Sequence, residues 1–246
     1  STKPISNELI RGLSKLEYRG YDSAGISGHG TRNKLSTIKA IGPIRNLKTQ
    51  LSKLKDITTA VSHTRWATHG QPTLKNTHPH LSDNICIVHN GIIENYLDLK
   101  IYLKKRGYFF KSDTDSEVIC HLINHYFKKS ADMKTTIVST ADSLEGSYAV
   151  AAINAKTPHT IYTACKGSPL VIGKGVNANY VSSDISPIVD HTKKYVPMDD
   201  NEFAEISPSS IQIFNKKKRT LKKEIKTSKI AKDQTSLLGH KHFMHK

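Results

Sequence analysis

Apolar residues recur at helical spacing in three parts of this chain. In the first part, residues 7–18, Ile10 and Leu13 fall on one face of a helix. In the third part, residues 116–129, apolar pairs recur every four residues, which defines one buried face. Gly107 is well suited to end the second helix, because glycine readily takes the left-handed conformation that follows a helix. We therefore predict helices over residues 7–18, 96–106 and 116–129.

The remaining apolar segments are short and indicate strands. The runs at 58–66 and 84–93 are extended in character, and the second is rich in β-branched residues. After residue 147, short apolar runs are separated by Gly, Pro, Asn and Ser, which is typical of antiparallel sheet. These later strands are predicted at 148–155, 160–165, 169–173, 180–184 and 210–214. Helices early in the chain combined with strands throughout predict an α+β fold in layers.

Composition excludes several classes of protein. The 246 residues are 37% hydrophobic, which is enough for a large core and is unlike a disordered chain. No apolar run approaches the roughly 20 residues that a membrane helix needs. The three cysteines are widely spaced and odd in number, so a disulfide framework is not expected. We predict a soluble protein of a reducing, cytoplasmic compartment that binds no membrane.

The net charge of +16 is unevenly distributed. Residues 216–232 hold nine Lys or Arg and one Glu, which is half of the net charge. Such a run could bind nucleic acid, but no aromatic residues interleave with it to stack on bases. We interpret it as a solvated surface segment and expect no nucleic-acid partner. The predicted domain organisation is a main domain over 1–215, followed by a basic domain edge and linker over 216–246.

The candidate chemistry lies in three polar segments at strand ends. They read EYRGYDSAG at 17–25, HTRWATHG at 63–70 and HNGIIEN at 89–95, with TDSE at 114–117 further on. Arg65 offers a planar fork that suits a carboxylate, and Asp115 could hold an ammonium group. Asn90 and Gly91 offer two adjacent N–H donors, as an oxyanion requires. A ligand with both a carboxylate and an ammonium group is an amino acid.

Each of these residues also has an ordinary structural interpretation. Asn90-Gly91 could be a hairpin turn, Asp115 could cap the helix that follows it, and Arg65 could lie on the surface. The residues alone do not select amide hydrolysis. The histidines at 78, 80, 240, 242 and 245 lack partners at metal-ligand spacing, so we predict no metal site and no cofactor.

Taken together, the four segments and the KGSPLVIG run at 166–173 resemble the glutaminase domain of the glutamine–fructose-6-phosphate aminotransferases, in their bacterial form. The resemblance covers nearly the whole chain. It implies a four-layer αββα sandwich of the N-terminal-nucleophile hydrolase type, as in class II glutamine amidotransferases. It implies L-glutamine as substrate and fructose 6-phosphate as an acceptor bound by further C-terminal domains. It also implies a homodimer for the whole enzyme.

The resemblance assigns roles to matching residues. Arg65 would bind the α-carboxylate of glutamine, Asp115 its α-ammonium group, and Asn90 and Gly91 would form the oxyanion hole. Four more residues would lie at the substrate site: Arg19 beside the nucleophile, and Trp66, Thr68 and His69 in a loop that closes over glutamine.

One feature of the family pattern is missing from this sequence. The family nucleophile is an N-terminal cysteine that opens a short strand, Cys-Gly-Ile-Val-Gly, before the first helix, whereas this chain starts at Ser1. Cys86, Cys120 and Cys165 are expected to be buried thiols, and Ser1 is expected to lie too far from the oxyanion donors to replace the cysteine. We therefore expect a fragment that is inactive by itself. The alternatives are a non-catalytic glutamine-binding module, a class II amidotransferase with another acceptor, and a basic interaction protein acting through 216–232.

Overall fold

The computed structural model describes residues 1–30, 34–66 and 70–230 of the chain. Its largest sheet has six antiparallel strands in the order β12-β11-β7-β6-β5-β4. These strands are β4 (His80–Ser82), β5 (Ile85–Ile93), β6 (Gly146–Asn154), β7 (Ile161–Lys166), β11 (Glu202–Ile206) and β12 (Ile211–Phe214). Two of its neighbouring strands, β5 and β6, pair over nine residues from Ile85↔Asn154 to Ile93↔Gly146.

Two smaller antiparallel sheets complete the β structure. One has the order β2-β1-β3 and the other the order β13-β10-β8-β9. The first consists of β1 (Ser23–His29), β2 (Leu35–Ile41) and β3 (Thr59–Arg65). The second consists of β8 (Val171–Lys174), β9 (Asn179–Ser182), β10 (Lys194–Pro197) and β13 (Lys226–Thr227).

Residue alternation along β6 shows how the layers pack. Tyr148 and Val150 belong to the main core cluster, which joins the six-stranded sheet to α4 (Ser116–Ser130) and α5 (Met133–Ser143). Ala149 packs instead with residues of β8 and β10, and Ala151 packs with Val61 of β3. Successive side chains of a strand point to opposite faces, so both smaller sheets cover the same face of the large sheet.

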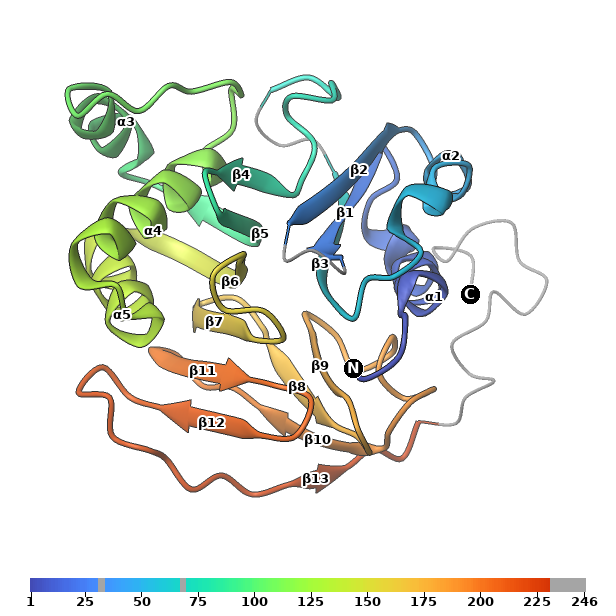
Figure 1. The fold of residues 1–246 in the computed structure, drawn as a ribbon. Coiled ribbons are helices and arrows are strands. Elements are labelled where there is room, and N and C mark those ends of the chain that lie inside the picture. The colour runs from blue at the N-terminus through green and yellow to red at the C-terminus, as the bar shows by residue number, and fades with distance from the viewer. Residues whose placement is uncertain (31–33, 67–69, 231–246) are drawn as a thin grey trace.

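Helices cover the two outer faces of this double β layer. In Figure 1, α3 (Tyr96–Lys104), α4 and α5 lie on one side, and α1 (Ser6–Leu16) and α2 (Arg45–Lys48) lie on the other. The outer helix α1 contributes Ile10 and Leu13 to a separate core with β1 and β2. The arrangement is a four-layer αββα sandwich, which confirms the α+β fold and the layering that the resemblance implied.

The strongest sequence patterns gave the correct elements. The helices expected at 7–18, 96–106 and 116–129 correspond to α1, α3 and α4, and Gly107 follows α3 with a φ of +84°. Five later strands and their antiparallel pairing are also confirmed. Eight α-helices and strands in the described part of the chain were not revealed by the sequence patterns: β1, β2, β4, β10, β11, β13, α2 and α5. All seven residues of β1 are buried, so it lacks the alternation of a half-buried strand, and α5 is rich in Ser and Thr.

The basic segment is joined to the sheets as far as residue 230. Lys226 and Thr227 form β13, which pairs with β10, and Lys223 contacts the carboxylates of Asp199 and Glu202. An unattached segment is therefore not observed over residues 216–230. The expected boundary after residue 215 stays a prediction, and residues 231–246 lie outside the described residues.

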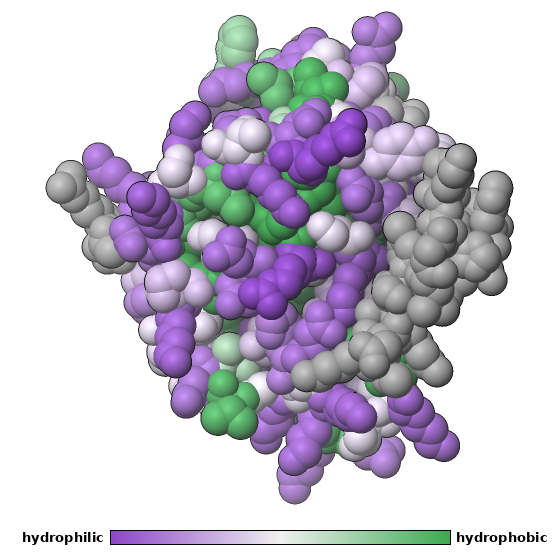
Figure 2. Space-filling model, turned by 90° about the vertical axis from the view of Figure 1, so that its right-hand side faces the viewer, coloured by the Kyte–Doolittle hydropathy of each residue, from purple (hydrophilic) through white to green (hydrophobic). Residues whose placement is uncertain are grey.

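The surface is mainly hydrophilic. Figure 2 shows polar residues predominating on one face, with apolar side chains visible between them near the middle of the view. Among the helices formed by the described residues, none is long and apolar enough to cross a membrane.

Candidate functional site

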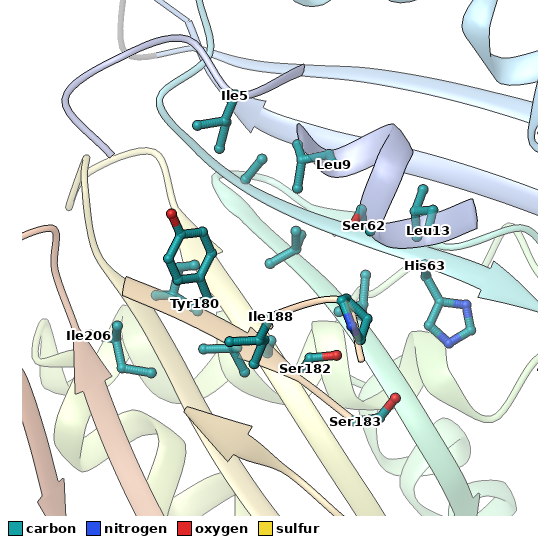
Figure 3. Close-up of a pocket in the computed structure, with 18 of the residues that line it drawn as sticks. Ile5, Leu9, Leu13, Ser62, His63, Tyr180, Ser182, Ser183, Ile188 and Ile206 are labelled. Atoms are coloured by element: carbon teal, nitrogen blue, oxygen red, sulfur yellow. The ribbon is translucent and has the colours of Figure 1, made fainter. Parts of the chain in front are cut away.

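A cavity of about 700 Å³ lies between the two smaller sheets. All residues of β3 and of β9 line it. In the described part of the chain β3 pairs with β1 alone and β9 with β8 alone, so each presents a free strand edge to the cavity. Figure 3 shows Leu9 and Leu13 of α1 on one side, and Tyr180 and Ile206 on the other. The cavity is thus a groove between two strand edges, lined by both apolar and polar side chains.

Six of the eight predicted site residues line this groove: Arg19, Trp66 and the four whose positions follow. Arg65 ends β3, Asn90 and Gly91 lie near the end of β5, and Asp115 immediately precedes α4. All four line the cavity. The structure therefore brings together residues that are up to 50 positions apart in the sequence.

The Arg65 side chain is buried, and backbone carbonyls hold its guanidinium in place. Its Nη2 donates to the carbonyl of Gly70 at 3.0 Å, and its Nη1 donates to that of Gln71 at 3.4 Å. Gln71 is fixed in turn by Asn76, whose Nδ2 donates to the same carbonyl at 3.0 Å. Burial lowers the pKa of Arg65, and the charges of Asp22 and Asp115 oppose that shift. Arginine remains charged under such conditions, so it presents a fixed positive group to the cavity.

Asp115 does not cap its helix in the ordinary way. Its side chain makes no capping hydrogen bond to the backbone of α4, and in the first turn it accepts only from Ser116 Oγ, at Oδ1 and 3.4 Å, among the described residues. Its Oδ2 instead accepts from the backbone N–H of Ile93 at 2.9 Å, which ties the start of α4 to the end of β5. The side chain is only 5% exposed, so the carboxylate is held in a fixed position at the cavity wall. The helix-cap interpretation of Asp115 is therefore wrong.

Asn90 and Gly91 do not form the tight hairpin turn that their dipeptide could indicate. Both lie inside β5 and pair with Ala149 and Tyr148 of β6. Gly91 has a φ of +131°, and a Cβ at this position would collide with the carbonyl oxygen of Ser147. Glycine is required here for both reasons. The backbone at Gly91 is thus bent out of ordinary strand geometry beside the exposed Asn90 side chain.

Three buried histidines, His78, His80 and His89, and the half-buried His63 surround these residues. The rings of His63 and His78 stack with centroids 4.2 Å apart, and the ring of His80 meets that of His78 edge-on at 4.6 Å. Burial lowers the pKa of His80 to about 3 and that of His89 to about 4. Burial also lowers the pKa of His63 and, further, that of His78. The four rings are therefore neutral at pH 7.

The other predicted substrate-site residues are less closely grouped. Arg19 lines the cavity, but its guanidinium contacts Ser183 Oγ at 3.2 Å and Asp184 Oδ2 at 3.5 Å in the segment after β9. Trp66 is 61% exposed and packs edge-to-face on Tyr21 with ring centroids 6.0 Å apart. Thr68 and His69 lie outside the described residues.

The three cysteines are buried thiols, as expected from the sequence. Cys86 lies in β5, Cys120 in α4 and Cys165 in β7. Burial raises the pKa of Cys86 and Cys165 to about 12, and it also raises the pKa of Cys120 well above the ordinary value of a thiol. A thiolate is the reactive form of cysteine, so none of the three is a suitable nucleophile at neutral pH.

Ser1 lies at the opposite end of β3 from Arg65. Its amino group donates to the carbonyl of Thr58 at 3.0 Å, just before the strand starts. Seven strand residues separate that point from the end of β3, which corresponds to about 20 Å. Ser1 is accordingly remote from Arg65, and its expected distance from the oxyanion donors Asn90 and Gly91 stays a prediction.

Sequence reasoning did not single out His63 as a candidate site residue, and it considered His78 and His80 only as possible metal ligands. His63 belongs to the HTRWATHG segment and lies two positions before Arg65 in a predicted strand. Residues two apart on a strand point to the same face, and this spacing was the available signal. His80 begins β4, while His78 reaches the site only through the tertiary fold. Across residues 1–30, 34–66 and 70–230, the His, Cys, Asp and Glu side chains form no group of three or more that could hold a metal ion.

Comparison with known proteins supports a common origin for this arrangement. The model of a glutamine amidotransferase domain matches residues 60–190. The chain is 40% identical over 246 residues to glutamine–fructose-6-phosphate aminotransferase (isomerising) from Francisella tularensis. It is 42% identical over 247 residues to the Methanosarcina acetivorans protein of the same name. The alignments cover 99% and 96% of this chain but about 40% of each relative.

A solved structure has the same fold. Glutamine phosphoribosylpyrophosphate amidotransferase from B. subtilis matches 88% of this chain with a TM-score of 0.74 and 26% sequence identity. The match covers 48% of that longer chain. The sequence and structural comparisons thus agree on one family.

Proposed function

This chain belongs to the glutamine amidotransferase domain family, of the class II type, and we propose that its cavity binds L-glutamine at Arg65 and Asp115. The observation that carries this proposal is the placement of a fixed guanidinium and a fixed carboxylate on the walls of one cavity. Arg65 would bind the α-carboxylate through its planar fork, and Asp115 would bind the α-ammonium group. Arg19 and Trp66 would border the bound amino acid.

Asn90 and Gly91 are the proposed oxyanion donors. A thiolate would attack the γ-carboxamide carbon of glutamine, and the carbonyl oxygen would gain the negative charge. The Asn90 side-chain NH₂ and the Gly91 N–H would stabilise that charge, which is worth about 10²–10³ in rate for each donor. The C–N bond would then break with proton transfer to nitrogen, and ammonia would leave. Water would hydrolyse the γ-glutamyl thioester to glutamate and the free thiol.

The groove between β3 and β9 has room for an extended segment that would carry this thiol. None of the three buried cysteines is a suitable nucleophile. An extended segment joined to Ser1 and running back along β3 would reach Arg65 after about seven residues, since β3 itself has seven. It would pair with the free edges of β3 and β9 and bury apolar side chains against α1 and the large sheet. A cysteine at its head, as the family pattern implies, would then stand beside Asn90.

The decisive experiment extends the chain before Ser1 by Cys-Gly-Ile-Val-Gly-Ala-Val. We expect glutamate release from L-glutamine, and no release from a twin that starts with Ser instead of Cys. L-glutamine binding without hydrolysis by the Cys-headed chain would favour a non-catalytic glutamine-binding module. Absence of L-glutamine binding to either chain, measured by calorimetry, would overturn the proposal.

Fructose 6-phosphate is the proposed acceptor for the released ammonia, in a larger enzyme that contains this domain. The support is the 40–42% identity to proteins named for that acceptor, against 26% to one named for phosphoribosylpyrophosphate. The chain spans about 40% of the length of these relatives, and the acceptor site and a homodimer contact would belong to further domains. Purified natural gene product should form glucosamine 6-phosphate from glutamine and fructose 6-phosphate. Amination of phosphoribosylpyrophosphate instead would select the alternative acceptor.

A further inference from the structure

A hydrogen bond between His63 and Asn90 joins two sheets at the cavity. His63 Nε2 lies 2.8 Å from Asn90 Oδ1. His63 belongs to β3 and Asn90 to β5, so the contact crosses from the small sheet to the large one. Figure 3 shows the His63 side chain extending from β3 into the lining of the pocket.

The backbone of β3 aims His63 at the large sheet. Val61 packs against Cys86 and Ala151 of that sheet. Residues two apart on a strand point to the same face, so His63 is directed to the same side. Its ring is further held by stacking on His78, with centroids 4.2 Å apart and an angle of 23° between the planes. His63 thus has little freedom to turn away from Asn90.

The orientation of the Asn90 amide sets the direction of the hydrogen bond. The amide oxygen faces the ring, and an amide oxygen accepts and does not donate, so His63 donates from Nε2 in this orientation. Burial lowers the pKa of the ring, and a neutral imidazole carries one N–H. Nδ1 is buried and has no partner among the described residues, which fits the unprotonated nitrogen. Within the same part of the chain, the Asn90 NH₂ group is paired with no acceptor.

We infer that His63 is the positioning residue of the oxyanion hole: its Nε2–H holds Asn90 Oδ1, so the Asn90 NH₂ group is presented to the cavity. This inference rests on the proposed function for the meaning of that NH₂ group. An asparagine amide can turn by half a rotation about its last bond, which exchanges oxygen and nitrogen. In the exchanged orientation the oxygen would face the developing negative charge and repel it. His63 disfavours that orientation because its Nε2–H needs an acceptor. The Asn90 oxygen can accept, whereas the Asn90 NH₂ group cannot.

The first test uses the unmodified chain labelled with ¹⁵N. Long-range ¹H–¹⁵N NMR should show the His63 ring protonated on Nε2 and unprotonated on Nδ1 at pH 7. The Asn90 side-chain NH₂ signals are identified by their loss in Asn90→Asp. A His63 ring protonated on Nδ1 would overturn the inference, because Nε2 would then accept from Asn90 and the amide would be reversed.

The second test separates a donor from a space-filling ring. Gln at position 63 retains an N–H donor, whereas Met is similar in length and has none. We expect the Asn90 NH₂ signals to stay close to the parent spectrum in His63→Gln and to shift or broaden in His63→Met. His29→Met is the matched control, because His29 is a buried histidine at the far end of the same sheet. If Gln and Met have equal effects on the Asn90 signals, the ring merely fills space and the inference fails.

These readouts do not depend on glutamine hydrolysis. In the cysteine-headed chain, His63→Met should lower kcat about 100-fold with KM within about threefold, and His63→Gln should recover most of kcat. An inactive parent chain with the expected NMR signals would reject the proposed function and keep the positioning of Asn90. An active parent with unchanged kcat in His63→Met would reject the positioning role and keep the proposed function.

Discussion

The backbone N–H of Ile93 donates to Asp115 Oδ2 at 2.9 Å. This bond joins the end of β5, which carries Asn90 and Gly91, to the start of α4. One carboxylate oxygen is thereby occupied, and the group is kept in place without a conventional helix cap. The proposed ammonium-binding group and the proposed oxyanion donors are held as one unit by a single side chain.

Asp115→Asn should separate the structural use of this side chain from its charge. The Asn oxygen can still accept from Ile93, so we expect little change in the thermal unfolding midpoint. Loss of the negative charge should weaken L-glutamine binding about tenfold or more, because a hydrogen bond to a charged group is worth about 1.5–3 kcal/mol. Calorimetry with L-glutamine measures the second effect. Unchanged affinity in a folded variant would show that Asp115 does not bind the ammonium group.

Arg65→Lys should weaken L-glutamine binding by about 10- to 100-fold. A lysine keeps the positive charge but replaces a planar two-pronged donor with a point charge, which cannot hold a carboxylate and the Gly70 carbonyl together. Arg45→Lys, at an exposed position of α2, is the control for the chemical change itself. Equal glutamine affinity in the two variants would remove Arg65 from the proposed binding site.

Gly91→Ala should destabilise the fold more than Gly107→Ala does. Both glycines have positive φ angles, which cost an alanine about 1–2 kcal/mol. At Gly107 a Cβ would meet nothing within 4 Å, whereas at Gly91 it would collide with the Ser147 carbonyl. Urea unfolding should therefore give a larger loss of unfolding free energy for Gly91→Ala. Equal losses would mean that the backbone angle alone explains the need for glycine.

The buried histidines should make the protein less stable as the pH falls from 7 to 5. Their folded-state pKa values lie below the ordinary value of 6.5, at about 3 for His80 and about 4 for His89. The unfolded chain therefore binds more protons below pH 6.5, and the free energy of unfolding falls by up to about 1.4 kcal/mol per pH unit for each histidine. Glu117, whose pKa is lowered to about 2, affects stability only below about pH 4.5.

Urea unfolding at several pH values measures this slope. In His80→Gln the slope between pH 6 and pH 5 should be smaller than in the parent chain. His159→Gln is a suitable control, because His159 lies outside the cluster of buried histidines, in the turn between β6 and β7. A parent slope near zero, or one unaffected by His80→Gln, would contradict the assignment of neutral buried rings.

Local sequence patterns predicted about half of the elements and indicated four candidate site residues. The periodicity of α1, α3 and α4 reflects one buried face on each helix, and such a face repeats every three to four residues. Arg65, Asn90, Gly91 and Asp115 were found because their chemistry is unusual at the ends of apolar segments. Only the tertiary structure shows that these four residues line one cavity. The separation of Arg65 and Asp115 along the chain does not determine their distance in space.

The tertiary structure alone decided how β3 and β9 face each other across a groove, and how His63 meets Asn90. Both relationships join segments of different sheets, and periodicity within a segment carries no information about its neighbour in another sheet. The same reason explains why β1 was missed: with all seven residues buried, it shows no polar face. The sequence by itself specified which chemical groups are present, and packing between layers specified which of them meet.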